Sequence, residues 1–112
     1  MTGNDRSKIR ILALYTDGAM EVLEIENTLA AMQKMVGGYI EAVQMGKGYV
    51  VIANEEGLIQ RLRFNLNTAH WPNPLVGDVF VTKAKGEEFA SLTDEDLKYL
   101  KGEVVKSGEK NQ

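Results

Sequence analysis

Residues 27–57, NTLAAMQKMVGGYIEAVQMGKGYVVIANEEG, decide the fold of this chain, because their apolar pattern changes from a helical period to a strand period. We expect a helix over 28–36 that is capped by Asn27 and ended by Gly37, since a cap side chain accepts a free N–H and glycine tolerates positive φ. The apolar residues of this helix recur every three or four positions, at Leu29, Met32 and Val36.

The second half of this stretch predicts a pair of strands. Residues 39–45 alternate with a period of two, and residues 46–48 form a short glycine-rich turn. Residues 49–53 (YVVIA) are apolar on both faces, which is typical of a strand in the covered interior of a sheet. Residues 54–57 (NEEG) then predict a further turn.

The remaining elements follow from shorter patterns. Residues 8–15 predict a first strand, the alternation in 23–26 predicts a second, and 78–84 predict a last one. Thr93 can cap a short helix with an acidic first turn, and Gly102 would end it. Together these elements predict an α+β fold, with a small, mostly antiparallel sheet of about five strands and two helices on one face.

The length of 112 residues is that of one domain, and its composition excludes several function classes. We expect residues 1–7 to be flexible, 8–101 to form the domain, and 102–112 to be a polar tail. A net charge of −3 does not suit generic nucleic-acid binding. No apolar run approaches the ~20 residues of a membrane helix. The chain has no cysteine and starts without a signal peptide, so we expect a cytoplasmic protein.

Four short motifs occur together: GGYIEAV at 37–43, NEEG at 54–57, VGDVF at 76–80 and FASLT at 89–93. In these motifs the chain resembles a family of small phage and integrative-element proteins that is catalogued as domain of unknown function 3846. The resemblance spans roughly residues 8–100. Members of that family usually carry Leu-Pro-x-Asn-Arg where this chain has LRFNL at 62–66, so the proline and the arginine of that motif are absent here. The resemblance implies an origin in a phage or mobile element.

Residues 58–77, which we term the acid-free segment, contain no Asp or Glu and form the least regular part of the chain. A ligand loop is one interpretation, because guanidinium groups bind phosphate and aromatic rings stack on bases. The alternative is a long surface connection whose aromatic residues cover the edge of the sheet. The candidate ligand residues of this segment are Arg61, Arg63, Phe64, Asn65, Asn67, His70 and Trp71.

Outside this segment, Glu41, Tyr39 and Asn54 are further candidates for ligand binding. Glu41 shares its strand face with apolar residues, so it either accepts a hydrogen bond from a ligand or lies where that face is open to water. The turn of residues 54–57, which includes Asn54, could bind a cation or a ribose hydroxyl, although a hairpin turn requires no such role. With one histidine and no cysteine, the sequence shows no nucleophile–base pair and no metal-binding motif. We therefore expect no catalytic residues, no metal and no cofactor.

These patterns lead to one hypothesis and one alternative. The hypothesis is a non-enzymatic, homo-oligomeric binding protein that sequesters a small anionic nucleotide-type signal of host immunity. The alternative is an adaptor or inhibitor that docks on a host protein through the acid-free segment or an open strand edge.

Overall fold

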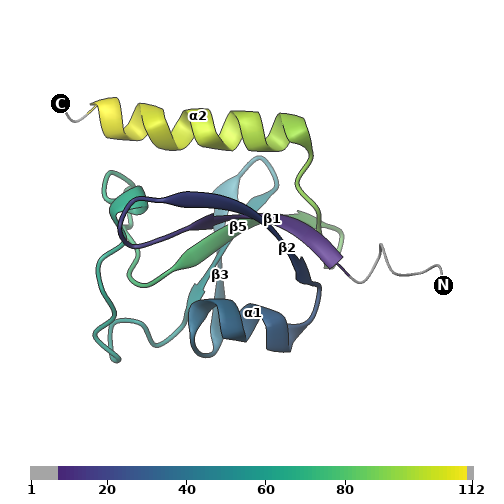
Figure 1. Cartoon of the computed structure of the whole chain (residues 1–112), viewed down its shortest axis with the longest axis horizontal. Helices are drawn as coiled ribbons and strands as arrows, with labels where there is room; N and C mark the ends of the chain where they lie inside the picture. Colours follow the sequence, from purple (N-terminus) through teal and green to yellow (C-terminus); the bar gives the residue numbers. More distant parts are fainter. Residues whose placement is uncertain (1–7, 111–112) are drawn as a thin grey trace.

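The computed structural model describes residues 8–110, and the side chains of residues 8–103 (Figure 1). In chain order the elements are β1 (Lys8–Leu14), β2 (Met20–Glu26), α1 (Leu29–Val36), β3 (Ile40–Gly46), β4 (Tyr49–Asn54), the 3₁₀ turn η2 (Leu66–Thr68), β5 (Val79–Lys85), β6 (Glu88–Ala90) and α2 (Asp94–Lys110).

The strands form one antiparallel sheet in the order β2-β1-β5-β4-β3, with β6 paired to β5 beyond this path. The predicted α+β fold is thus confirmed. Helix α1 connects β2 to β3, which are the first and last strands of that order. The short strand β6 was not predicted, because three residues are too few to show an alternating pattern.

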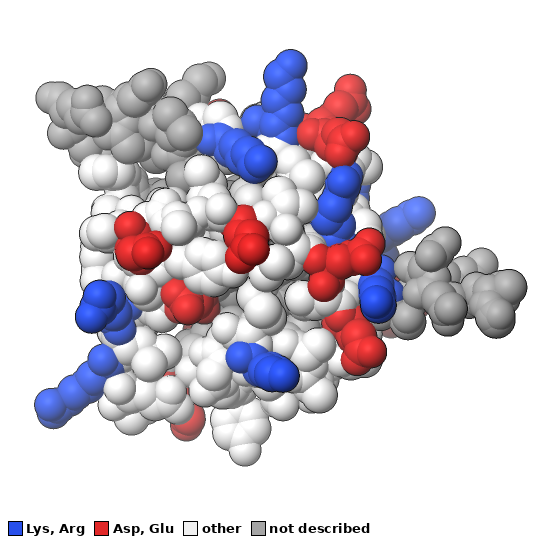
Figure 2. Space-filling view, viewed as in Figure 1, with Lys and Arg blue, Asp and Glu red and all other residues white. Residues whose placement is uncertain are grey.

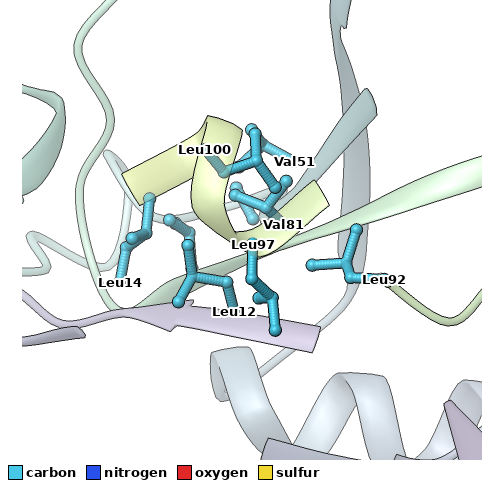
Figure 3. Close-up of a cluster of buried hydrophobic side chains, with 9 residues drawn as sticks. Leu12, Leu14, Val51, Val81, Leu92, Leu97 and Leu100 are labelled. Atoms are coloured by element: carbon cyan, nitrogen blue, oxygen red, sulfur yellow. The ribbon is translucent and has the colours of Figure 1, made fainter. Parts of the chain in front are cut away.

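The helices lie on opposite faces of the sheet, so the prediction of two helices on one face is wrong (Figure 1). Strands β1, β4 and β5 are apolar on both faces, and such strands need a cover on each side. Met32 and Val36 of α1 pack on one face, in a cluster that includes Phe80. Leu97 and Leu100 of α2 pack on the other face, in the cluster shown in Figure 3.

Helix α1 is capped by Thr28, and not by Asn27 as the sequence predicts. The hydroxyl of Thr28 accepts the Ala31 N–H at 3.1 Å, whereas the side chain of Asn27 donates to the Phe89 carbonyl at 3.4 Å. Asparagine and threonine are both good helix caps. Thr28 caps α1 because the side chain of Asn27 is already bonded to the Phe89 carbonyl. The predicted end at Gly37 is confirmed, since this residue has a φ of 81°.

Helix α2 continues through Gly102 to Lys110, so its predicted end at Gly102 is wrong. Glycine inside a helix costs only about 1 kcal/mol relative to alanine and does not by itself end one. The predicted cap at Thr93 is confirmed, because its hydroxyl accepts the Asp96 N–H at 3.0 Å. The expected flexible residues 1–7 lie outside the described residues. In the described part of the chain, no helix has the length and apolarity needed to cross a membrane.

The acid-free segment is folded back on itself. Phe64 pairs with Val76 in an isolated β-bridge, and the N–H of Gly77 donates to the carbonyl of Arg63 at 2.6 Å. The N–H of Asn65 donates to the carbonyl of Leu75 at 2.9 Å. The two ends of the segment therefore run side by side, and the residues between them form a loop next to the sheet.

Candidate functional site

Asn65 is a structural residue of the acid-free segment. Its side chain is fully buried, and its amide nitrogen donates to the carbonyls of Leu14 at 2.9 Å and Gly77 at 2.8 Å. Its amide oxygen accepts the N–H of Asn67 at 2.9 Å. Because these bonds join β1 to both ends of the loop, the amide of Asn65 is not free to contact a ligand.

Asn67 and Asn54 are also engaged inside the protein. The amide nitrogen of Asn67 donates to the carbonyls of Tyr15 and Ala19, at 3.0 and 2.9 Å. That of Asn54 donates to the Val36 carbonyl at 3.1 Å, which ties β4 to the end of α1. Both side chains are buried, so their amides, like that of Asn65, bind backbone carbonyls of the protein itself and do not face a ligand.

The two arginines do not meet the aromatic residues of their segment in one pocket. Arg61 is exposed in the turn after β4, with a positive φ of 59°. Arg63 is also exposed and borders a shallow hollow of about 290 Å³ beside the C-terminal end of α1, together with Lys34 and Asp78. The carbonyl end of a helix and a nearby carboxylate both disfavour anions, so this hollow is a poor phosphate site despite its two cations.

Trp71 borders a cleft of about 510 Å³ on the α2 face of the sheet. We term it the aromatic cleft. Its walls come from the end of β3, the β3–β4 turn, the start of β4, the acid-free segment and α2. The lining residues are Val43, Gln44, Met45, Gly46, Lys47, Tyr49, Trp71, Pro72, Asn73, Tyr99 and Glu103.

The aromatic rings of the cleft are held in a defined arrangement. Tyr49 and Tyr99 stack, with ring centroids 5.6 Å apart and planes inclined by 17°. The Lys47 ammonium lies 5.1 Å from the centroid of the Tyr99 ring, which is a cation–π distance. Trp71 is half-buried and packs against the same hydrophobic cluster as Tyr49. The cleft therefore combines flat apolar surfaces with one positive charge at its border.

A polar cluster behind the cleft fixes Tyr49 to helix α2. The hydroxyl of Tyr49 donates to Asp96 at 2.7 Å, and the Lys83 ammonium donates to the other oxygen of the same carboxylate at 2.7 Å. Burial, together with the bond to Asp96, raises the pKa of Tyr49 to about 12. Burial alone would raise the pKa of Asp96, but hydrogen bonds from Lys83, Thr93 and Tyr49 outweigh it and hold that pKa well below its usual range. Tyr49 thus stays a neutral donor and Asp96 a charged acceptor.

We expect Asp96→Asn to lower the free energy of unfolding at neutral pH by about 2 kcal/mol, since charged hydrogen bonds in a mostly buried cluster are lost. The pKa of Asp96 is lower in the folded than in the unfolded chain, so its contribution is full above about pH 4 and is lost as the pH falls further. Urea unfolding at a series of pH values from neutral to acidic should therefore show that the free energies of unfolding of wild type and Asp96→Asn converge below that pH. Asp94→Asn is the matched control, because the side chain of Asp94 is 92% exposed. Equal effects of both substitutions would contradict the role given to Asp96.

The other predicted ligand residues lie outside the aromatic cleft. His70 and Glu41 are exposed, and the exposure of Glu41 confirms that its strand face is open to water there. Tyr39 is 64% exposed just before β3, and Phe64 is 44% exposed at the β-bridge of the acid-free segment. Of the predicted ligand residues, only Trp71 lines the cleft.

The sequence-based prediction leaves out Lys47, Tyr49 and Tyr99, which form most of the aromatic surface with Trp71. Each of them fits its local element, since Lys47 lies in a turn, Tyr49 in a strand and Tyr99 in a helix. The local pattern therefore does not mark them as residues of a site. A weak signal exists in Tyr49, because a tyrosine beside two buried valines needs a partner for its hydroxyl.

Charged side chains do not mark a single patch on the face shown in Figure 2, where Lys and Arg are interspersed with Asp and Glu. A nucleic-acid-binding face would instead carry clustered positive charge. The aromatic cleft is thus a candidate site because of its volume and its aromatic rings, and not because of clustered charge.

Comparison with known proteins places the chain in a family without assigning an activity. A family model described as "Domain of unknown function (DUF3846)" matches residues 9–104, which confirms the resemblance seen in the sequence. No curated protein and no solved structure matches the chain. Because the matched range covers most of its 112 residues, the chain belongs to the family described as Domain of unknown function (DUF3846).

Proposed function

We propose that this chain is a non-enzymatic binding protein that holds a small, ring-bearing anion of the nucleotide type in the aromatic cleft. The observation that carries the proposal is the arrangement of Trp71, Tyr99 and Lys47 around one cleft of about 510 Å³. This volume lies in the range of pockets that hold small molecules. Sequestration of a host immune signal by a protein of a phage or mobile element is our hypothesis for its biological role.

Stacking would supply most of the affinity for such a ligand. Aromatic side chains contribute about 1–3 kcal/mol per stacked base, and they do so for any base because every base has a flat face. Lys47 supplies a positive charge beside the rings, which suits one phosphate group. Glu103 also lines the cleft and would repel a second phosphate group, so we expect multiply charged ligands to gain no affinity over a ligand with one phosphate.

The composition of the cleft supports binding without turnover. Its described lining residues include no histidine, serine, threonine or aspartate, and Glu103 is the one carboxylate among them. Tyr49 has its pKa raised to about 12 by burial and by its bond to Asp96, so it is a poor general base near neutral pH. In the described part of the chain, no three or more His, Cys, Asp or Glu side chains are grouped so that they could hold a metal ion.

Isothermal titration with AMP, adenosine and a cyclic dinucleotide tests the proposal. We expect Trp71→Leu and Tyr99→Leu to weaken nucleotide binding by about tenfold each, because leucine preserves apolar packing but cannot stack. Lys47→Met should weaken binding of AMP but leave binding of adenosine unchanged. Arg63→Ala is the control, since Arg63 borders the other hollow. After incubation, chromatography should recover the nucleotide intact.

Two results would contradict this proposal. Loss of binding in Arg63→Ala with normal binding in Trp71→Leu would move the site to the hollow beside α1. Conversion of the nucleotide would make the protein an enzyme.

A protein-binding function is the second candidate, and a specific observation favours it. Leu58 and Ile59 are each 80% exposed on a turn that backbone hydrogen bonds hold in place. Exposed apolar side chains on an ordered turn are typical of protein contact surfaces. Absence of binding for every nucleotide in the titration, together with a host protein that is captured by wild type and not by Leu58→Ser, would favour this function.

A further inference from the structure

We infer that the free edge of β3 pairs with the β3 edge of a second copy of this chain, in antiparallel orientation. Strand β3 is the last strand of the sheet order, and β4 is the strand that pairs with it in the described part of the chain. Such an edge presents unpaired N–H and C=O groups, which can bind another strand. The inference does not depend on the ligand proposed for the aromatic cleft.

The register of β3 shows which backbone groups are free. The carbonyl of Tyr39 accepts the Glu55 N–H at 2.8 Å, so the backbone groups of Tyr39 point towards β4. Because this direction alternates along an antiparallel strand, the backbone groups of Ile40, Ala42 and Gln44 point away from β4. The N–H and C=O groups of these three residues are regularly spaced along the free side of β3. The β-bulge of this strand lies after them, between Gln44 and Gly46.

The two edges of the sheet differ in their protection against pairing. Strand β2, at the opposite edge, carries three glutamates, at 21, 24 and 26. Charged side chains of one sign along an edge keep other strands away. Strand β3 has Glu41 as its one charged residue, and its sequence IEAVQMG is otherwise apolar or neutral. Of the two edge strands, β3 is therefore the one that can accept a partner strand.

Charge complementarity identifies the partner as a second copy. Glu41 lies near the start of β3, and Lys47 lies directly after its end. Antiparallel pairing of the two β3 edges therefore brings the Glu41 end of each copy towards the Lys47 end of the other. Two opposite-charge pairs then form by symmetry. Pairing with a β2 edge would instead bring Glu41 against glutamates.

The pairing would also extend the wall of the aromatic cleft. Val43 and Met45 of β3 line the cleft, and Glu41 shares their strand face because it pairs with Ala53 of the α2-face cluster. A second copy would therefore place its own Glu41 at the end of β3 that borders the cleft. Both clefts would open on the same face of one continuous sheet.

The mass of the protein in solution, measured by light scattering and sedimentation without added ligand, tests this inference. We expect wild type to be a dimer of about twice the 12.4 kDa of one chain. Ala42→Pro should be monomeric at the same concentration, since it removes a free N–H and no bond to β4. A wild-type monomer, or an Ala42→Pro dimer, would overturn the inference.

Charge reversal provides a second test that does not depend on proline strain. Glu41→Lys and Lys47→Glu should each weaken the dimer by about tenfold, because both symmetric pairs become repulsive. The double variant should restore the wild-type affinity. Glu24→Lys on β2 is the matched control and should leave the dimer unchanged. Failure of the double variant to restore affinity would overturn the antiparallel pairing.

Discussion

Asn65→Ala is expected to lower the free energy of unfolding by about 3 kcal/mol and the melting temperature by roughly 15 °C. The substitution leaves the carbonyls of Leu14 and Gly77 and the N–H of Asn67 without their partner. All three contacts involve a side chain with no exposed surface, so water cannot replace the lost bonds without opening the loop. Urea and thermal unfolding measured by circular dichroism provide the test.

Asn73→Ala is the matched control for this prediction. Asn73 lies in the same acid-free segment, and it is exposed. Substitutions of exposed residues outside caps and networks usually change stability by no more than about 0.5 kcal/mol. Similar losses in the two variants would show that the buried amide of Asn65 is not what holds the loop on β1.

Leu100→Ala is expected to have an effect of similar size, about 3 kcal/mol, because it leaves a cavity between α2 and the sheet. Leu100 is 1% exposed and belongs to the cluster shown in Figure 3. Tyr99 is carried by the same helix turn, so looser packing of α2 should also weaken nucleotide binding in the aromatic cleft. Unfolding measurements and the same titration would report the two effects separately.

Leu58→Ala tests the same chemical change at a site without burial. Leu58 is 80% exposed, and its truncation should change stability by less than about 0.5 kcal/mol. The difference in stability loss between Leu100→Ala and Leu58→Ala would therefore be caused by the burial of Leu100. A large loss in Leu58→Ala would instead mean that this leucine is covered in solution, for example by another protein.

The course of the chain could be predicted from the sequence to a large extent. The period of apolar residues reveals which face of an element is buried, so α1 and the β3–β4 hairpin are recognisable locally. The double-faced apolar pattern of 49–53 indicates cover on both sides, and the structure provides that cover with one helix on each face. This pattern therefore argues against two helices on one face. The cap of α1 depended on a contact with a distant residue, because the side chain of Asn27 is bonded to the Phe89 carbonyl.

The site was much less predictable than the fold. Arg63 and Trp71 are close in sequence, but the loop between them turns around the buried Asn65 and Thr68, and they border different hollows. Conversely, Lys47 and Tyr99 are far apart in sequence and meet in the cleft on the α2 face of the sheet. Polar residue types in a loop do not reveal whether an amide faces a ligand or the backbone of its own chain, as Asn65 shows.

By itself, the sequence determined five strands, the presence of two helices and the family of this protein, because alternation, helical spacing and short motifs are local properties. Only the tertiary structure decided which polar residues are structural and which rings share a cleft. The physical reason is that burial and hydrogen-bond partners are set by segments distant in the chain. The position of α2 over β3 and β4 brings Tyr99 to Tyr49, and no local pattern encodes that contact.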